Sequence, residues 1–130
     1  MAHCVLYRMH MSGRILIVED HKECRHIIAL QMQAVGCEII EAESALIGLE
    51  KATTEKPDLI IMDLRMPGMN GIEATRCLKS HPLTRHIPVV VYTAWGAENW
   101  RKEALSAGAA MVLTKPDSFN LLRELARRLQ

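Results

Sequence analysis

Short runs of large apolar residues recur along the chain, and each is followed by a segment whose apolar positions have helical spacing. The apolar runs are rich in Val, Ile and Leu and are bounded by polar residues, Gly or Pro, as buried strands are. The segments between them place apolar residues three and four positions apart and end at Gly or before Pro, which indicates helices. We therefore predict strands at 14–20, 37–42, 58–63, 87–93 and 110–114, and helices at 21–36, 45–56, 71–80, 97–108 and 119–129.

Two of the predicted helices begin at recognisable capping residues. Ser44 is placed to cap the helix 45–56, and Asn70, with Glu73 three residues later, forms a capping-box pattern. Two other helices show a clear apolar stripe on one face. The predicted stripes are Cys24, Ile28, Met32 and Val35 in the first helix, and Phe119, Leu122, Ala126 and Leu129 in the last.

The regular alternation of strands and helices predicts an α/β architecture. Strands that are apolar throughout are covered on both faces, which is typical of a parallel sheet flanked by helices. Five strand–helix units are too few for an eight-stranded barrel, so the sheet should be open and doubly wound. With right-handed crossovers we expect a flavodoxin-like five-stranded parallel sheet of order 2-1-3-4-5, flanked by five helices.

Length and composition limit the classes of protein to consider. The 130 residues suit one domain, which we place at 14–130, with 1–13 as a flexible leader. The net charge of +1 gives no electrostatic case for a nucleic acid or an anionic membrane as the main ligand. Without a membrane-spanning run or a secretory signal, a cytoplasmic protein is expected. The four cysteines lack CxxC spacing, so we expect reduced thiols that are mostly buried.

Polar side chains collect where the predicted strands end. Glu19 and Asp20 end the first strand, Asp63 ends the third, Thr93 ends the fourth, and Lys115 follows the fifth. In open parallel sheets, ligands bind beyond the carboxyl ends of the strands, at the point where the strand order reverses. Carboxylates held close together repel one another, and a divalent cation relieves that repulsion. Hard oxygen ligands of this kind suit Mg²⁺.

Asp63 is the residue whose position most needs a chemical reason. A buried carboxylate is costly unless it is paired or binds a cation. A carboxylate can also act as a nucleophile and become an aspartyl phosphate. In that chemistry Lys115 and the metal would offset the charge on the phosphoryl oxygens, and Thr93 would donate a hydrogen bond.

Several motifs together resemble the receiver domain of bacterial two-component response regulators, and in particular the single-domain, chemotaxis-receiver-like members. The resemblance extends over residues 14 to 130 and is specific as a set, although each motif alone is weak. The matching segments are LIVED (16–20), PDLIIMDLRMPGMNGIE (57–73), IPVVVYTA (87–94) and LTKP (113–116).

The resemblance implies a role for each residue of the expected metal site. Asp63 would be the phosphoacceptor and would also face the Mg²⁺ ion. Asp20 would be a direct ligand, Glu19 would act mostly through water, and the carbonyl of Arg65 would complete the protein ligands.

The resemblance also implies a phosphorylation-dependent switch of a two-component system or phosphorelay. Thr93 would be the switch hydroxyl and Lys115 would contact the phosphoryl group, which a histidine kinase or a histidine phosphotransfer protein would donate. We expect no output domain after residue 130, and therefore a single-domain response regulator that is not a turnover enzyme. Its output would pass to a downstream protein through the face formed by 97–108, 110–114 and 119–129.

One position departs from the family pattern. Receivers commonly carry an aromatic residue three positions before the lysine, where this chain has Val112. Tyr92 precedes Thr93 directly and must face the other side of its strand, so it is not a simple substitute. The phosphorylation chemistry is expected to be intact, while the usual relay to the output face is not.

Three other functions fit the same fold less well. A phosphorylation-independent interaction module usually lacks one of the acids or the lysine, and this chain keeps them all. An aspartyl-phosphate phosphatase would carry Asp-x-Asp, whereas Arg65 stands at the second place. A flavin-binding flavodoxin would need a Ser/Thr/Gly-rich loop after the first strand, where this chain has EDHKE.

Overall fold

The computed structural model describes residues 13–94, 98–115 and 119–129, so the expected leader lies outside the described residues except for its last residue, Gly13. The described part forms alternating strands and helices. The strands are β1 Arg14–Val18, β2 Glu38–Ala42, β3 Leu59–Met62, β4 Val89–Thr93 and β5 Met111–Thr114, and the helices are α2 Lys22–Ala34, α3 Ala45–Glu55, α4 Gly71–Ser80, α5 Glu98–Ser106 and α6 Phe119–Arg127.

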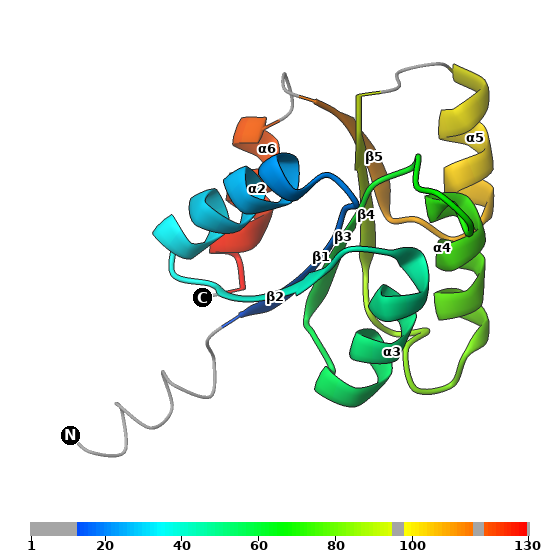
Figure 1. The fold of residues 1–130 in the computed structure, drawn as a ribbon, viewed down its shortest axis with the longest axis horizontal. Helices are drawn as coiled ribbons and strands as arrows, with labels where there is room; N and C mark the ends of the chain where they lie inside the picture. The colour runs from blue at the N-terminus through cyan, green and yellow to red at the C-terminus, as the bar shows by residue number, and fades with distance from the viewer. Residues whose placement is uncertain (1–12, 95–97, 116–118, 130) are drawn as a thin grey trace.

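The strands form one parallel sheet between two layers of helices. Its order is β2-β1-β3-β4-β5, which confirms the predicted doubly wound topology. Helices α2 and α6 cover one face, and α3, α4 and α5 cover the other (Figure 1). Because β1 lies between β2 and β3, the chain reverses its direction of winding beside β1, and this places the ends of β1 and β3 next to each other.

The strand register brings the predicted acids to one edge of the sheet. Val18, the last residue of β1, is the register partner of Met62, the last residue of β3. The pairing continues one step further, because the Asp63 N–H donates to the carbonyl of Val18 at 3.0 Å. The residues that follow β1 and β3 therefore emerge side by side.

The apolar strands are buried on both sides, as predicted. On the α2 and α6 side, Ile15 and Ile17 pack with Leu122 of α6, and on the other side Leu16 and Val18 belong to a second cluster. Burying each side chain of this size contributes about 1.5–3 kcal/mol, so the alternating residues of a single strand stabilise both helix layers.

Local capping signals set the starts of two helices as predicted. The Ser44 hydroxyl accepts a hydrogen bond from the Ile47 N–H at 3.2 Å. At α4, the Asn70 side chain accepts from the Glu73 N–H at 2.9 Å, and the Glu73 carboxylate accepts from the Asn70 N–H at 3.1 Å. None of the helices in the described part of the chain has the length and apolar character that a bilayer span requires.

The predicted face of α6 is confirmed, whereas that of α2 is partly wrong. Leu122 and Ala126 are buried in α6, but in α2 Cys24 is exposed and Ala29 is buried instead. Cys24 lies in the first turn of α2 and lines the pocket described below. Cys77 is also exposed, so the expectation of mostly buried cysteines is wrong as well.

Two glycines shape the turn between β3 and α4, and each has its own reason. Gly71 donates its N–H to the carbonyl of Leu64 at 2.9 Å, and a Cβ there would clash with the carbonyl oxygen of Asp63 and lie 3.0 Å from Leu64 Cα. Gly68 has a φ of +76° and open space around its Cα. Gly71 thus lets α4 begin directly against the backbone of Asp63.

Replacing Gly71 with Ala is expected to destabilise the fold by about 3 kcal/mol, because the clash involves backbone that cannot move aside without shifting Asp63. The matched variant Gly68→Ala meets only the left-handed backbone penalty, about 1 kcal/mol. Urea unfolding of both variants measures the difference. Equal losses of stability would show that close approach at Gly71 does not matter.

Candidate functional site

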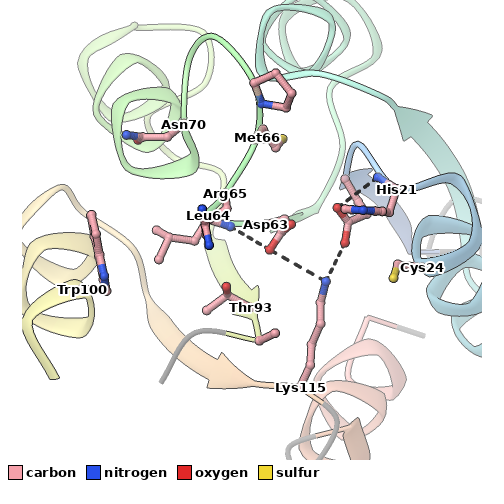
Figure 2. A pocket seen from close by; sticks show the side chains of 13 residues that line it. His21, Cys24, Asp63, Leu64, Arg65, Met66, Asn70, Thr93, Trp100 and Lys115 are labelled. Atoms are coloured by element: carbon pink, nitrogen blue, oxygen red, sulfur yellow. Dashed lines mark hydrogen bonds and ion pairs between the residues drawn. The ribbon is translucent and has the colours of Figure 1, made fainter. Parts of the chain in front are cut away.

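A pocket of about 820 Å³ opens at the carboxyl edge of the sheet (Figure 2). Five of the residues predicted from the sequence line it, and they come from the ends of β1, β3, β4 and β5. They are Glu19, Asp63, Arg65, Thr93 and Lys115. Asp20 directly follows Glu19 and is not among the lining residues, but one of its carboxylate oxygens lies within 4.8 Å of a donor atom of Glu19 and of His21, which both line the pocket.

Backbone pairing holds the pocket residues in place. The Asp63 carboxylate accepts a hydrogen bond from the N–H of Leu64 at 2.9 Å, which turns it toward the pocket. Thr93 is the last residue of β4 and only 1% exposed. Its carbonyl accepts from the N–H of Lys115 at 2.8 Å, so the two residues leave the sheet together. Residues far apart in the sequence are thus held around one space.

Lys115 contacts two of the acids, and one of these contacts was not predicted. Its Nζ donates a 2.6 Å hydrogen bond to Glu19 Oε1 and lies 3.8 Å from Asp63 Oδ1 (Figure 2). Glu19 is therefore the direct partner of Lys115 in this structure. The pairing crosses from β1 to β5, so no local spacing in the sequence signals it.

Tyr92 faces away from Thr93, as predicted, but it still reaches the lysine. Its ring is 5.5 Å from Lys115 Nζ, within cation–π range, and packs edge-on against Phe119 with ring centroids 6.3 Å apart. Val112 lies in a different cluster on the α4 and α5 side. The ring of Tyr92 therefore contacts Lys115 from the α2 and α6 side of the sheet, whereas an aromatic residue at position 112 would lie on the α4 and α5 side.

The two most buried acids have opposite shifts in pKa. Burial, reinforced by the neighbouring Glu19, raises the pKa of Asp63 to about 7, and the charge of Lys115 only partly opposes this. Burial acts on Glu19 in the same direction, but the hydrogen bonds from Lys115 and Asp63 outweigh it and hold the pKa of Glu19 below its ordinary value. Of the two carboxyl groups, Glu19 is therefore the one that ionises more readily, and Asp63 is the one that holds its proton up to about pH 7.

The acidic side of the pocket offers two carboxylates, which suit a hard cation, beside an imidazole, which such an ion does not require. One donor atom from each of Glu19, Asp20 and His21 lies within 4.8 Å of the other two. Asp20 Oδ1 is buried and has no hydrogen-bond partner, and it lies 3.6 Å from His21 Nδ1. An orphaned carboxylate oxygen beside a second carboxylate is what Mg²⁺ binding would satisfy, so these residues fit the predicted ion.

The pocket also contains residues that the sequence did not indicate. Trp100 reaches it from α5, and Cys24 from α2. Asn70 was expected only as a helix cap, yet it also lines the pocket. Their positions depend on how the helices pack at the sheet edge, and no spacing in the sequence reports that packing.

Comparison with known proteins agrees with this geometry. The family model of the response regulator receiver domain matches residues 15–127. The phosphate regulon transcriptional regulatory protein PhoB of Pseudomonas aeruginosa is 40% identical over 121 residues, which are 92% of this chain and 52% of PhoB. This chain thus spans about half of the length of that relative.

Two further matches have nearly the same extent as this chain. Protein PilH of Pseudomonas aeruginosa is 36% identical over 114 residues, covering 87% of this chain and 94% of PilH. The structure of the Vibrio cholerae chemotaxis protein CheY4 superposes with a TM-score of 0.83 at 25% identity, covering 92% of this chain and 99% of CheY4. The chain therefore belongs to the family of response regulator receiver domains, which act in two-component signalling.

Proposed function

We propose that the chain is a phosphorylation-dependent switch that accepts a phosphoryl group on Asp63 from a phosphohistidine donor. The observation that carries this proposal is the position of Asp63, which is 9% exposed, 3.8 Å from Lys115 and close to Glu19 of the acidic pair Glu19 and Asp20. Family membership supports the same chemistry. A buried carboxylate with a raised pKa, next to unused metal donors, has the features of a nucleophile that a cation activates.

Four residues would hold the ion. Asp20 and Asp63 would bind it directly, the carbonyl of Arg65 would complete the protein ligands, and Glu19 would act through water. When bound, Mg²⁺ supplies positive charge that favours ionised Asp63 and offsets the charge of the phosphoryl oxygens.

In the transfer itself, an Asp63 oxygen forms a bond to phosphorus as the phosphorus–nitrogen bond of phosphohistidine breaks. The electron pair of that bond leaves with the imidazole of the donor, which is a histidine kinase or a histidine phosphotransfer protein. Lys115 neutralises charge on the phosphoryl oxygens, and the Thr93 hydroxyl donates to one of them. The chain promotes its own phosphorylation and slow dephosphorylation without turning over a separate substrate.

The output would use α5, β5 and α6 to bind a downstream protein. Trp100 belongs to α5, lines the pocket and is 36% exposed, so it links the site to this face. Leu105 and Leu121 are exposed apolar residues on α5 and α6. Val112 shares a buried cluster with Ala104 of α5 and with Ala107 and Ala109, which follow that helix, so a movement near Thr93 can reach α5 without an aromatic rotamer change.

The direct test is incubation with acetyl phosphate and Mg²⁺, followed by intact-mass measurement. We expect one base-labile phosphoryl group per chain, and none when a chelator removes the metal. No uptake under these conditions would favour a phosphorylation-independent interaction module. Steady release of phosphate from simple phosphate esters would favour a phosphatase.

Asp20→Asn is expected to weaken Mg²⁺ binding far more than Glu19→Gln. Asp20 supplies a direct ligand oxygen, whereas Glu19 acts through water and already binds Lys115 at 2.6 Å. Losing a direct carboxylate ligand should reduce affinity by about tenfold or more. Titration calorimetry with MgCl₂ measures both variants against the wild type. Equal losses would contradict this division of roles.

A further inference from the structure

The backbone of Glu19 is held from two sides. Its N–H donates to the carbonyl of Ala42 at 3.1 Å, and its own carbonyl accepts from Arg25 Nη1 at 2.8 Å. That carbonyl belongs to the planar peptide unit between Glu19 and Asp20. A bond to it therefore restrains the direction in which the Asp20 side chain leaves the backbone.

Arg25 is itself well restrained. Its Nε donates to Glu41 Oε1 at 3.0 Å, and its side chain is only 14% exposed. A guanidinium carries several donors in one rigid plane, so it reaches a carbonyl and a carboxylate at the same time. On the far side, Lys51 Nζ donates to the carbonyl of Glu41 at 2.6 Å. The contacts form a continuous path from the surface of α3 to the acidic pair.

The charges along this path also matter. Arg25 places a positive charge near carboxylates that are to bind a cation, which by itself disfavours the ion. Its ion pair with Glu41, at 3.0 Å, opposes that charge. The pair therefore provides the geometric restraint of a guanidinium at a smaller electrostatic cost to the metal site than an unpaired arginine would.

We propose that Arg25 is a positioning residue for the cation site. It contacts neither the ion nor the phosphoryl group, and it holds the Glu19–Asp20 peptide so that the Asp20 carboxylate is presented to Mg²⁺. Glu41 keeps Arg25 in place and balances its charge. This inference rests on the proposed function of the pocket as a Mg²⁺ and phosphoryl site.

The test is titration calorimetry of the whole chain with MgCl₂ and no phosphodonor. The double variant Arg25→Ala with Glu41→Ala keeps the net charge, and we expect its dissociation constant for Mg²⁺ to rise about tenfold, as for lost outer-shell partners. Arg25→Lys keeps the charge but has one ammonium instead of a planar fork, so it should recover only part of the affinity. Lys51→Ala removes only a bond to the main chain of Glu41 and leaves both bonds of Arg25 in place, so it should not weaken binding.

Phosphorylation kinetics separate positioning from a general loss of structure. In the double variant, the Mg²⁺ concentration for half-maximal phosphorylation by acetyl phosphate should rise, while the rate at saturating Mg²⁺ stays close to that of the wild type. A lower melting temperature with unchanged Mg²⁺ affinity would overturn the inference, since Arg25 would then be only structural. If the double variant does not fold, the Mg²⁺ affinity of Arg25→Lys gives the same test: weaker binding supports the inference, and unchanged binding overturns it.

The controls distinguish this inference from the proposed function. In one outcome, the wild type binds Mg²⁺ and takes up a phosphoryl group, and the Arg25 variants bind Mg²⁺ equally tightly. That outcome would overturn the role of Arg25 and leave the proposed function standing. Wild-type chain that binds no Mg²⁺ would overturn the proposed function and this inference with it.

Discussion

Asp63→Asn is expected to abolish phosphorylation of the chain by acetyl phosphate in the presence of Mg²⁺. The amide has nearly the same shape and keeps the oxygen that accepts from the Leu64 N–H, but it lacks the anionic oxygen that attacks phosphorus. Intact-mass measurement after incubation gives the result directly, because each phosphoryl group adds a fixed mass.

Asp58→Asn is the matched control for that experiment. Asp58 stands at the opposite end of β3, is exposed, and accepts a hydrogen bond from the Arg14 N–H at 2.9 Å, which an amide oxygen can still accept. It should be phosphorylated as the wild type is. Uptake of one phosphoryl group by Asp63→Asn would show that another residue is the acceptor.

Asp63→Asn should also raise the free energy of unfolding of the chain at pH 8 when no Mg²⁺ is present. The pKa of Asp63 is raised from 3.8 to about 7, mainly by burial, so the folded state holds a proton that the unfolded state releases. The stability of the wild type therefore falls as the pH rises from about 4 to about 7, by up to roughly 4 kcal/mol. Asparagine does not ionise and avoids this loss.

Urea unfolding in the presence of a chelator, at pH 4 and pH 8, measures the effect. We expect similar stabilities of the wild type and Asp63→Asn at pH 4, and a gain of about 2–4 kcal/mol for the variant at pH 8. Added Mg²⁺ should reduce the difference, because the cation favours ionised Asp63. A variant that is less stable than the wild type at pH 8 would contradict the raised pKa.

The elements and their order could be predicted because the signals for them are local. Apolar runs, helical spacing and the caps at Ser44 and Asn70 depend on neighbours within a few residues. The predicted strand 14–20 extended too far only because Glu19 and Asp20 follow directly, while the ladder with β3 ends at Val18. Parallel strands with right-handed crossovers then leave few possible topologies.

Most of the candidate site could be predicted for a related reason. The carboxyl ends of parallel strands meet at one edge, so residues that end separate strands converge wherever the strands pair. Glu19, Asp63, Thr93 and Lys115 are brought together in this way. Their convergence follows from topology and needs no knowledge of side-chain packing.

The contacts within the site were decided by the tertiary structure. Glu19, which was expected to act on the metal mostly through water, is 2% exposed and is also the direct hydrogen-bond partner of Lys115. The ring of Tyr92, on the opposite face of β4 from Thr93, reaches the same lysine. Lysine has a long, flexible side chain, so its partner is chosen by packing among several acids within reach.

The amino-acid sequence by itself determined which residues end each strand, and with them the chemistry available at the sheet edge. Only the tertiary structure decided that Asp63 and Glu19 share one buried space and so have opposite shifts in pKa, and that Arg25 binds the carbonyl of Glu19. Local patterns report interactions between neighbours along the chain. Burial and charge coupling depend on segments far apart in the sequence, and these meet only in the folded state.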